Sequence, residues 1–193
     1  MRWERLDIPG TDACTVRPLA GGWRLEGIAA FGSGAHATRL EYAVDADSSW
    51  CTRRGIVRGT EGGRAIRLDA ERITTGEWRI NGDPMPGLTG LVDLDLGFTP
   101  ATNLFPLRRL ALGVGDAADA SAAWLDAAAW TFRRLSQRYE RRDAAHYWYR
   151  SPETGYEGLL EVTAEGFVAD YPGLWRAAWP DSPPFTSIRG LEA

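Results

Sequence analysis

The sequence predicts a mainly β protein, folded as an antiparallel sandwich or barrel. Two observations support this fold class. Short runs in which apolar and polar residues alternate recur along the first half of the chain, as expected for strands with one buried face. About seven such runs follow one another at spacings of roughly 8–14 residues, with turn-forming Gly, Pro, Asn and Asp residues between them.

Six of these runs are predicted as short strands before residue 81. The alternation is clearest where Leu40, Tyr42 and Val44 share one face. Asn81-Gly82 is the strongest hairpin signal, because both residues tolerate the positive φ angles of a tight turn. The expected strands cover residues 12–20, 23–31, 38–44, 50–60, 64–69 and 77–80.

The segment 90–110 brings together more kinds of chemistry than any other. Its first part alternates strictly, with apolar side chains on one side of a strand and Asp93 and Asp95 on the other. Thr99 can then cap a short helical turn that Pro100 starts. The apolar face consists of Val92, Leu94, Leu96 and Phe98, and the polar residues after the turn are Thr102, Asn103, Arg108 and Arg109.

The C-terminal half is predicted to add two hairpins. Their arms are residues 138–142 with 146–150, and 158–162 with 166–171. The alanine-rich stretch 117–134 suits a helix by propensity and paired strands by context, so both alternatives stay open.

The tail from Pro172 onward, which contains Trp175 and Trp179, is expected to be irregular and to lie over the surface. No internal repeat or composition shift marks a domain boundary. We therefore treat residues 1–193 as a single domain.

Composition argues against several function classes. The net charge is −4 and all 22 basic residues are Arg, so no basic field favours nucleic-acid binding. No run reaches the roughly 20 apolar residues that cross a bilayer, and the start lacks the apolar core of a signal peptide. With Cys14 and Cys51 as the only cysteines, we expect a cytoplasmic protein with two free thiols and no integral membrane segment.

The charged residues of segment 90–110 allow several interpretations. Asp93 and Asp95 could be an acid/base pair, metal ligands, a solvated strand face, or partners of an arginine. If Arg108 and Arg109 lie on a strand, only one faces inward, where it needs a carboxylate or an anionic or hydroxyl-rich ligand. The neighbouring Thr and Asn side chains can instead satisfy their own backbone.

The sequence offers no positive case for catalysis. His36 and His146 are the only histidines, and no nucleophile elbow accompanies them. Zinc spacings, phosphate loops and dinucleotide fingerprints are also absent from the sequence. We therefore expect neither a catalytic site nor a metal or other cofactor.

Aromatic residues recur on the predicted strands. Each is first expected in the core, but together they could line a groove for acyl chains or stack on sugar faces. The set is Trp23, Trp50, Trp78, Tyr147, Trp148, Tyr149, Tyr171 and Trp175.

Four blocks of the sequence resemble the putative glycolipid-binding family of bacteria, formerly a domain of unknown function. The most specific is VDLDLGFTPATNLFPLRRL at residues 92–110. The others are LEYAVDADSSW at 40–50 with Thr52 and Arg53, QRY at 137–139, and GFVADYPGLW at 166–175. The resemblance implies an unclosed antiparallel barrel, similar to the periplasmic lipoprotein carriers, with lipid on its concave face and no enzymatic activity.

We therefore predict non-catalytic binding of a glycolipid or other lipid-like amphiphile in the groove of a half-barrel with one or two short helices. The apolar face of the 92–98 strand would bury the acyl part, and the polar residues would hold the head. The predicted ligand-binding residues are Arg108, Arg109, Asn103, Thr102, Asp93, Asp95, Trp50, Arg53, Trp78, Tyr149 and Trp175.

Two alternatives remain. The first is a hydrolase or isomerase acting on a similar amphiphile, with His36 or His146 next to Asp93 or Asp95. The second is a protein-interaction module that docks through the tryptophan-rich tail. The sequence leaves open the ligand, the oligomeric state and the face of the 91–98 strand that lines the groove.

Overall fold

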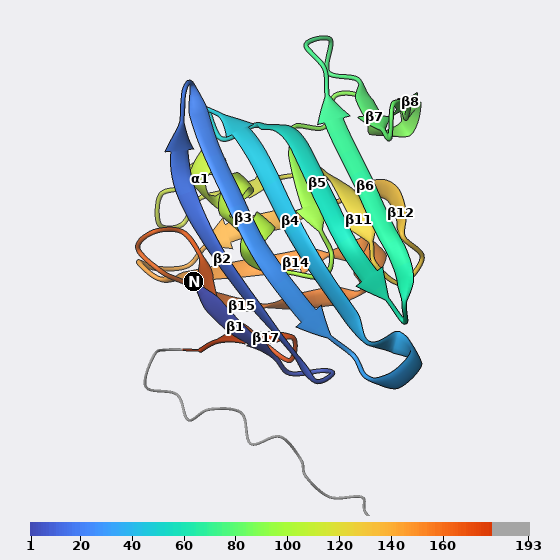
Figure 1. Cartoon of the computed structure of the whole chain (residues 1–193). Helices are drawn as coiled ribbons and strands as arrows, with labels where there is room; N and C mark the ends of the chain where they lie inside the picture. The colour runs from blue at the N-terminus through green and yellow to red at the C-terminus, as the bar shows by residue number, and fades with distance from the viewer. Residues whose placement is uncertain (179–193) are drawn as a thin grey trace, which may run out of the picture.

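The computed structural model describes residues 1–178, which are mainly β-strands with one α-helix (Figure 1). The strands form a 14-stranded antiparallel sheet and a separate sheet of three strands. Within these residues the edge strands of the large sheet, β10 and β8, do not pair with each other, so the barrel stays unclosed. The predicted fold class is confirmed.

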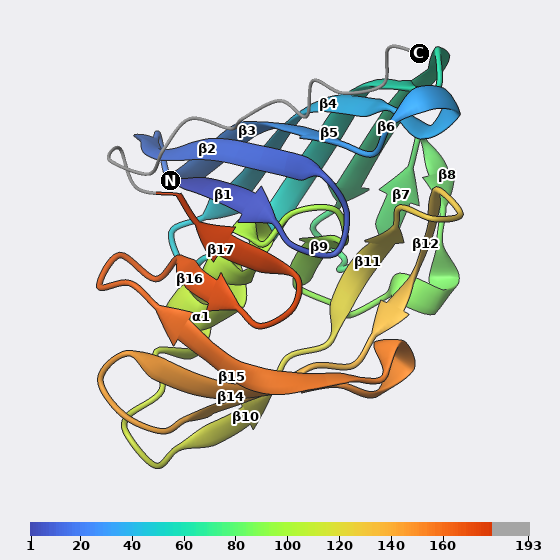
Figure 2. The same ribbon diagram turned by 90° about the horizontal axis from the view of Figure 1, so that it is seen from below.

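The large sheet consists of two meanders joined by the N-terminal strand. The first is β2 (Gly10–Leu19), β3 (Gly22–Phe31), β4 (Thr38–Asp47), β5 (Thr52–Glu61), β6 (Arg64–Arg72), β7 (Trp78–Ile80) and β8 (Asp83–Pro84). The second is β10 (Ala117–Asp119), β13 (Arg138–Arg141), β14 (His146–Ser151), β15 (Tyr156–Val162), β16 (Val168–Tyr171) and β17 (Trp175–Ala177). Strand β1 (Arg2–Arg5) lies between β17 and β2 and pairs with both (Figure 2).

The small sheet contains β9 (Asp93–Leu96), β11 (Ala122–Asp126) and β12 (Thr131–Leu135). Strands β9 and β11 are parallel, whereas every neighbouring pair in the large sheet is antiparallel. Figure 2 shows β11 and β12 between the β7–β8 end of the large sheet and strands β14 and β15.

Short helical segments connect the strands. They are the 3₁₀ turns η1 (Gly34–His36), η2 (Pro86–Leu88), η3 (Ala101–Asn103) and η4 (Pro152–Thr154), and the helix α1 (Leu104–Leu110). Helix α1 follows η3 directly and ends at Ala111, which adopts the left-handed conformation with φ 45°. The predicted turn after Thr99 is thus the start of a longer helical segment that carries Arg108 and Arg109 in its last turn.

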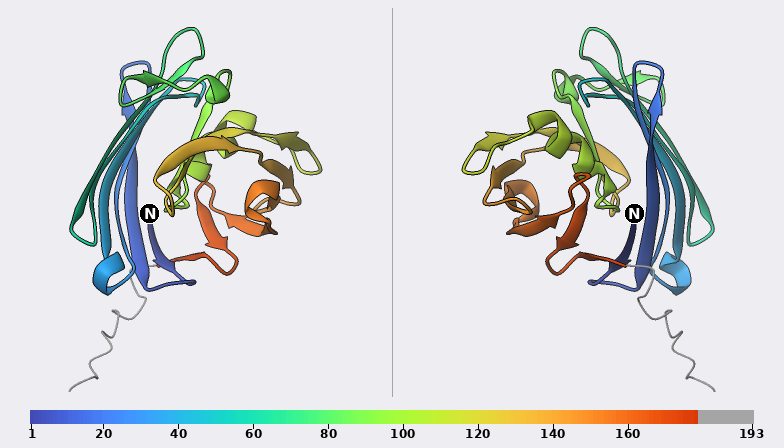
Figure 3. Two further views of the ribbon diagram at one scale, coloured as in Figure 1. Left: turned by 90° about the vertical axis from the view of Figure 1, so that its right-hand side faces the viewer. Right: turned by 90° about the vertical axis from the view of Figure 1, so that its left-hand side faces the viewer.

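The inner face of the long strands is filled by β9 and α1. Figure 3 shows the long strands as one curved layer, with the rest of the chain on its inner side. Leu40, Tyr42 and Val44 point inward and are buried, as their alternation predicts. On β9 and just after it, Leu94, Leu96 and Phe98 are at most 1% exposed and belong to the same core. The acyl-binding role predicted for this apolar row is therefore wrong, because its side chains are packed against protein.

A buried polar network ties the turn after β9 to the large sheet. The Tyr42 hydroxyl donates to both oxygens of Asp12, at 2.9 Å each, and the Thr99 hydroxyl donates to Asp12 Oδ2. Burial raises the pKa of Asp12 to about 6, although these two hydroxyls oppose the rise. The Thr99 hydroxyl also accepts from the backbone N–H of Ala101, which starts the first helical turn.

Three predictions about single elements change. Stretch 117–134 contains strands β10, β11 and the start of β12, so the strand alternative is correct. Residues 2–5 form a strand that the sequence pattern did not reveal. Within the tail expected to be irregular, Trp175 begins strand β17, which pairs with β1; Trp179 lies outside the described residues.

Candidate functional site

A cavity of about 250 Å³ lies between the small sheet and the C-terminal half of the large sheet. It is lined by Asp95, Gly97, Thr99, Pro100, Asn103, Trp124, Leu135, Tyr149, Thr154, Tyr156, Tyr171, Leu174 and Trp175. Five of these thirteen side chains are aromatic and one is a carboxylate, so we call this space the Asp95 cavity.

Asp95 is the charged group of the cavity. Strand β9 directs Asp95 away from the core row of Leu94 and Leu96, toward the C-terminal strands. Gln137 donates from Nε2 to Asp95 Oδ2 at 2.7 Å, and the same nitrogen lies 3.1 Å from the Tyr149 hydroxyl. The second carboxylate oxygen, Oδ1, has no hydrogen-bond partner among the described residues.

The electrostatic environment of Asp95 favours the neutral carboxyl. Burial raises its pKa to about 7, the nearby Asp93 carboxylate adds to the rise, and the Gln137 hydrogen bond opposes it. The amide oxygen of Gln137, Oε1, is buried and has no partner in the described part of the chain. Since buried polar atoms are normally paired, this region has hydrogen-bonding capacity that residues 1–178 do not use.

Three tyrosines form the wall contributed by β14, β15 and β16. The ring centroids of Tyr156 and Tyr171 are 4.8 Å apart, and those of Tyr149 and Tyr171 are 5.7 Å apart. Adjacent rings are inclined to each other by 44° to 71°, so the cluster presents both faces and edges. The Tyr156 hydroxyl donates to the carbonyl of Pro172 at 2.9 Å, which fixes one ring against the following turn.

The cavity depends on a glycine on its β9–β11 side. A Cβ on Gly97 would meet the indole Nε1 of Trp124 and would lie 2.8 Å from the carbonyl oxygen of Leu125. The missing side chain lets the Trp124 indole lie close over the end of β9. Position 97 of segment 92–98 is therefore a glycine because the Trp124 indole packs closely against it, and not because of the strand face on which it lies.

Asp93 has a different environment, although it shares a strand face with Asp95. It is 1% exposed and accepts two hydrogen bonds from Arg109. Burial raises the pKa of Asp93, and the guanidinium of Arg109 opposes this rise. Of the interpretations left open for these residues, the arginine partner is the one realised for Asp93, and the solvated strand face is wrong.

The eleven predicted ligand-binding residues fall into two groups. Four of them, from four separate segments, line the Asp95 cavity: Asp95, Asn103, Tyr149 and Trp175. Asn103 is buried and donates from Nδ2 to the Tyr139 hydroxyl at 2.8 Å. The structure thus brings these four together, and their role toward a ligand stays a prediction.

The other seven lie elsewhere. Thr102 accepts from the backbone N–H of Leu96, so it satisfies the local backbone. Trp78 is fully buried and donates to the Leu91 carbonyl at 2.9 Å, which makes it a core residue. The remaining members are Asp93 and Arg109, which pair with each other, Arg53, which is exposed on β5, and Trp50 with Arg108.

Trp50 and Arg108 form a separate cluster at the end of the long strands. The Trp50 ring stacks on Trp23, with 4.6 Å between centroids and 12° between planes. The guanidinium carbon of Arg108 lies 5.5 Å from the Trp50 ring centroid. Trp50 adopts a positive φ of 65°, which is uncommon for a residue with a bulky side chain.

Trp124 and Tyr156, which line the cavity, and Gln137, which donates to Asp95, were among the residues not predicted as site residues. Gln137 begins the short QRY block, but nothing in the sequence indicated that its amide reaches Asp95. Trp124 lies in the stretch whose secondary structure was ambiguous, and Tyr156 follows a turn glycine. An aromatic or amide side chain in or next to a short strand is too common in the sequence to single them out.

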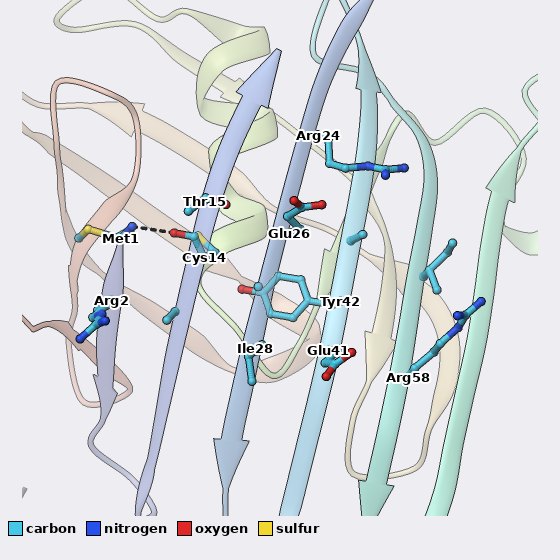
Figure 4. Close-up of a pocket in the computed structure, with 14 residues that line it drawn as sticks. Met1, Arg2, Cys14, Thr15, Arg24, Glu26, Ile28, Glu41, Tyr42 and Arg58 are labelled. Atoms are coloured by element: carbon cyan, nitrogen blue, oxygen red, sulfur yellow. Dashed lines mark hydrogen bonds between the residues drawn. The ribbon is translucent and has the colours of Figure 1, made fainter. Parts of the chain in front are cut away.

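A second hollow, of about 820 Å³, is broad and shallow and lies on the outer face of strands β1 to β5 (Figure 4). Its polar lining includes Arg24, Glu26, Glu41 and Arg58, and Ile28 is an exposed apolar member. Arg24 is held by Asp45 of β4 through two bonds of 2.6 Å. We regard this outer depression as the weaker candidate, because its charges are mixed in sign and those of Glu41 and Arg58 are exposed to solvent.

The two histidines do not join either aspartate of β9. His36 is exposed in η1, and the His146 Nδ1 lies 2.9 Å from Asp143 in the turn before β14. Neither lines the Asp95 cavity. The His–Asp pair that the enzyme alternative requires is therefore not formed with Asp93 or Asp95.

Other features of the described residues bear on the sequence predictions. Cys14 is buried and Cys51 half-buried, and both are free thiols, as expected. Residues 1–178 contain no cluster of three or more His, Cys, Asp or Glu side chains placed to hold a metal. No helix in this part of the chain has the length and apolar character needed to span a bilayer.

Comparison with known proteins places the chain in a family. The model of the family described as "Putative glycolipid-binding" matches residues 1–177. The crystal structure of a DUF1089 family protein from Pseudomonas aeruginosa is similar to this chain, with a TM-score of 0.75 and 28% sequence identity over 86% of this chain and 92% of that chain. Comparison with curated proteins gives no match. The chain belongs to the putative glycolipid-binding family.

Proposed function

We propose that this protein binds the polar head of a glycolipid or a similar amphiphile in the Asp95 cavity, without changing the ligand chemically. The observation that carries this proposal is a carboxylate in a cavity walled by aromatic rings, with one oxygen that has no hydrogen-bond partner within residues 1–178. Such a combination suits a small polar group with apolar faces, because the rings cover the faces and the carboxylate accepts from its donors. The family name supports a glycolipid as the ligand class.

The size of the cavity limits what enters it. At about 250 Å³ it lies just below the range of roughly 300–1,000 Å³ that is typical of pockets for drug-sized ligands. One ring-sized head fits this space, whereas an acyl chain in addition does not. The apolar part of an amphiphile would therefore extend past the rim, where Thr154 is exposed.

This proposal changes the division of roles expected from the sequence. The residues proposed to contact the head are Asp95, Asn103, Tyr149 and the neighbouring aromatic side chains. Arg109 is engaged by Asp93, so its proposed role is to position β9 and not to bind the ligand.

The first experiment is native mass spectrometry of the purified protein, followed by solvent extraction and identification of any bound molecule. We expect a co-purified amphiphile whose head is small enough for the cavity. The same measurement on Asp95→Asn should show a reduced bound fraction, while Glu41→Gln in the outer depression should match the wild type.

The variants also decide where the ligand lies. A ligand that survives Asp95→Asn but is lost in Glu41→Gln or Arg58→Ala would place binding on the outer face and contradict the proposed site. All three variants are expressed and purified in the same way as the wild type. A folding defect is then recognised by a lower yield of soluble protein.

A further inference from the structure

The Asp95 cavity has an unbalanced charge. Asp95 is the only carboxylic acid among the lining residues, and none of them is an arginine or lysine. The two aspartates that are almost fully buried within residues 1–178 have stronger internal partners. Asp93 has the guanidinium of Arg109, and Asp12 accepts from two hydroxyls. Asp95 has a single neutral donor, from Gln137, on one oxygen.

The aromatic walls of the cavity also favour a positively charged ligand. The face of an aromatic ring carries partial negative charge and attracts cations, most strongly in a space shielded from water. The ring centroids of Tyr149, Tyr156 and Tyr171 lie within 6.1 Å of one another. Because the rings are inclined to each other, a ligand can contact more than one of them. An anionic head would meet both Asp95 and these ring faces unfavourably.

Two cavity tryptophans already carry cations on their rings. The guanidinium carbon of Arg133 lies 4.5 Å from the Trp124 ring centroid, and that of Arg5 lies 5.3 Å from the Trp175 ring centroid. Each arginine is also paired with its own aspartate, Arg133 with Asp126 and Arg5 with Asp7. Their charges are offset locally, so they do not neutralise Asp95.

We infer that the head group accepted by the Asp95 cavity carries a positive charge, as a protonated amine or a quaternary ammonium group. This inference rests on the proposed function, and it names the chemical class of the head. A cation completes the charge balance of a buried carboxylate, whereas a neutral sugar only fills the free acceptor position. The three tyrosines surround the charge, and Asn103 and the Thr154 rim remain for additional polar contacts.

The protonation of Asp95 gives this inference a second observable. The charged and titratable groups around Asp95 are Asp93 with its partner Arg109, and the tyrosines Tyr139, Tyr149 and Tyr171. These tyrosines have raised pKa values and stay neutral near pH 7. A cation binds the ionised form of Asp95, so binding releases a proton near pH 7 and affinity rises with pH between about 6 and 8.

The test uses pairs of probes that differ in charge and little else. Choline is compared with 3,3-dimethylbutan-1-ol by isothermal titration calorimetry at pH 6 and pH 8, and glucosamine with glucose at pH 6, where the amine of the sugar is protonated. Two buffers of different ionisation enthalpy count the protons released. We expect the charged member of at least one pair to bind at least about tenfold more tightly, with proton release at the lower pH.

Variants then connect the selectivity to the site. Asp95→Asn keeps the shape of the side chain and should abolish the difference between charged and neutral probes. Tyr156→Leu removes one half-buried ring and should weaken the cation by several-fold, which provides a second reading if Asp95→Asn is poorly folded. Glu41→Gln, a carboxylate of the outer depression, should leave the selectivity unchanged.

The outcomes separate this inference from the proposed function. Selectivity for choline indicates a quaternary head, and selectivity for glucosamine indicates an amino sugar. Equal or tighter binding of the neutral probes, lost in Asp95→Asn, would leave the cavity as the head-group site but would overturn the positive charge. If neither cation binds at millimolar concentration, the inference is also wrong, whereas the proposed function is still decided by the molecule found in native mass spectrometry.

Discussion

The guanidinium of Arg109 donates two hydrogen bonds to the carboxylate of Asp93, from Nε to Oδ1 at 3.1 Å and from Nη2 to Oδ2 at 2.5 Å. This ion pair joins the last turn of α1 to β9 across the buried side of the strand. The Asp93 side chain is 1% exposed and that of Arg109 is 21% exposed, so water screens the pair only weakly. An arginine that the sequence suggested for ligand binding thus has a structural role.

Replacement of Arg109 by alanine should strongly destabilise the fold. Without the guanidinium, Asp93 stays buried with no charge partner, and breaking such a pair typically costs about 3–5 kcal/mol. Arg108→Ala is the matched control, because Arg108 is exposed and mainly contacts the Trp50 ring; its loss should cost no more than about 1 kcal/mol. Urea unfolding of both variants measures the difference, and equal stabilities would show that the ion pair does not hold β9 to α1.

The stability of the protein should fall as the pH rises from about 4.5 to 7. The pKa of Asp12 is raised to about 6 and that of Asp95 to about 7, both from an ordinary value of 3.8. At a pH between 3.8 and its raised pKa, each of these carboxyls is protonated in the folded state and ionised in the unfolded state. The free energy of unfolding therefore decreases with pH, by up to about 1.4 kcal/mol per pH unit for each such proton.

Urea unfolding at half-unit pH steps tests this slope. Asp95→Asn should flatten the curve between pH 6 and 7, and Asp12→Asn should flatten it between pH 4.5 and 6. Asp69→Asn is the control, because the Arg54 side chain lowers the pKa of Asp69; its contribution to stability is constant between pH 4.5 and 7, so the variant changes the level of the curve and not its slope. A stability that increases steadily over this range would contradict the burial of ionisable carboxyls described above.

Thr52→Val should destabilise the attachment of β9 to β5. The Thr52 hydroxyl accepts from the backbone N–H of Leu94 at 3.2 Å, at a fully buried position. Valine has nearly the same shape but no acceptor, so the N–H is left unsatisfied at a cost of about 1–3 kcal/mol. The control Thr131→Val changes an exposed threonine of β12 and should alter the free energy of unfolding by less than about 0.5 kcal/mol.

Gly55→Ala should be destabilising through overpacking. A Cβ on Gly55 would collide with the Cδ2 atom of Leu94, which is buried and has little space to move, so we expect a loss of about 1–3 kcal/mol. Gly87→Ala provides the comparison, because a Cβ at Gly87 meets no atom within 4 Å. Thermal unfolding of the two variants measures the effect; an unchanged midpoint for Gly55→Ala would mean that β9 shifts readily against β5.

The long strands could be predicted because their local pattern and their packing agree. Four or more alternating positions, as in 38–44, specify both a strand and its buried face, and Asn81 and Gly82 adopt the positive φ values that their turn requires. The strands Arg2–Arg5 and Trp175–Ala177 are too short to give such a repeat. Residues 2–5 and 175–177 pair with each other across almost the entire described chain, and a local pattern carries no information about a partner so distant.

Only part of the candidate site could be predicted, because the local sequence pattern points to some of its residues and not to others. Asp95 was conspicuous because it interrupts an apolar strand, and Tyr149 because it belongs to the aromatic residues that recur on the predicted strands. That Asp93 binds Arg109 while Asp95 faces a cavity could not be predicted, because the two residues share one strand face and differ only in what packs against it. Arg109 of α1 meets Asp93 and Gln137 meets Asp95, and both contacts depend on tertiary structure.

The position of β1 between β17 and β2 has a consequence for how the chain folds. The two meanders of the large sheet consist of local hairpins that can form early, but they become one sheet only when the last described strand meets the first. Closing that contact involves a loop of about 170 residues, so the step carries a large entropic barrier and is expected to be slow. During synthesis β1 therefore has one unoccupied edge until residues 175–177 have left the ribosome, and docking of β17 is the event that joins the two meanders.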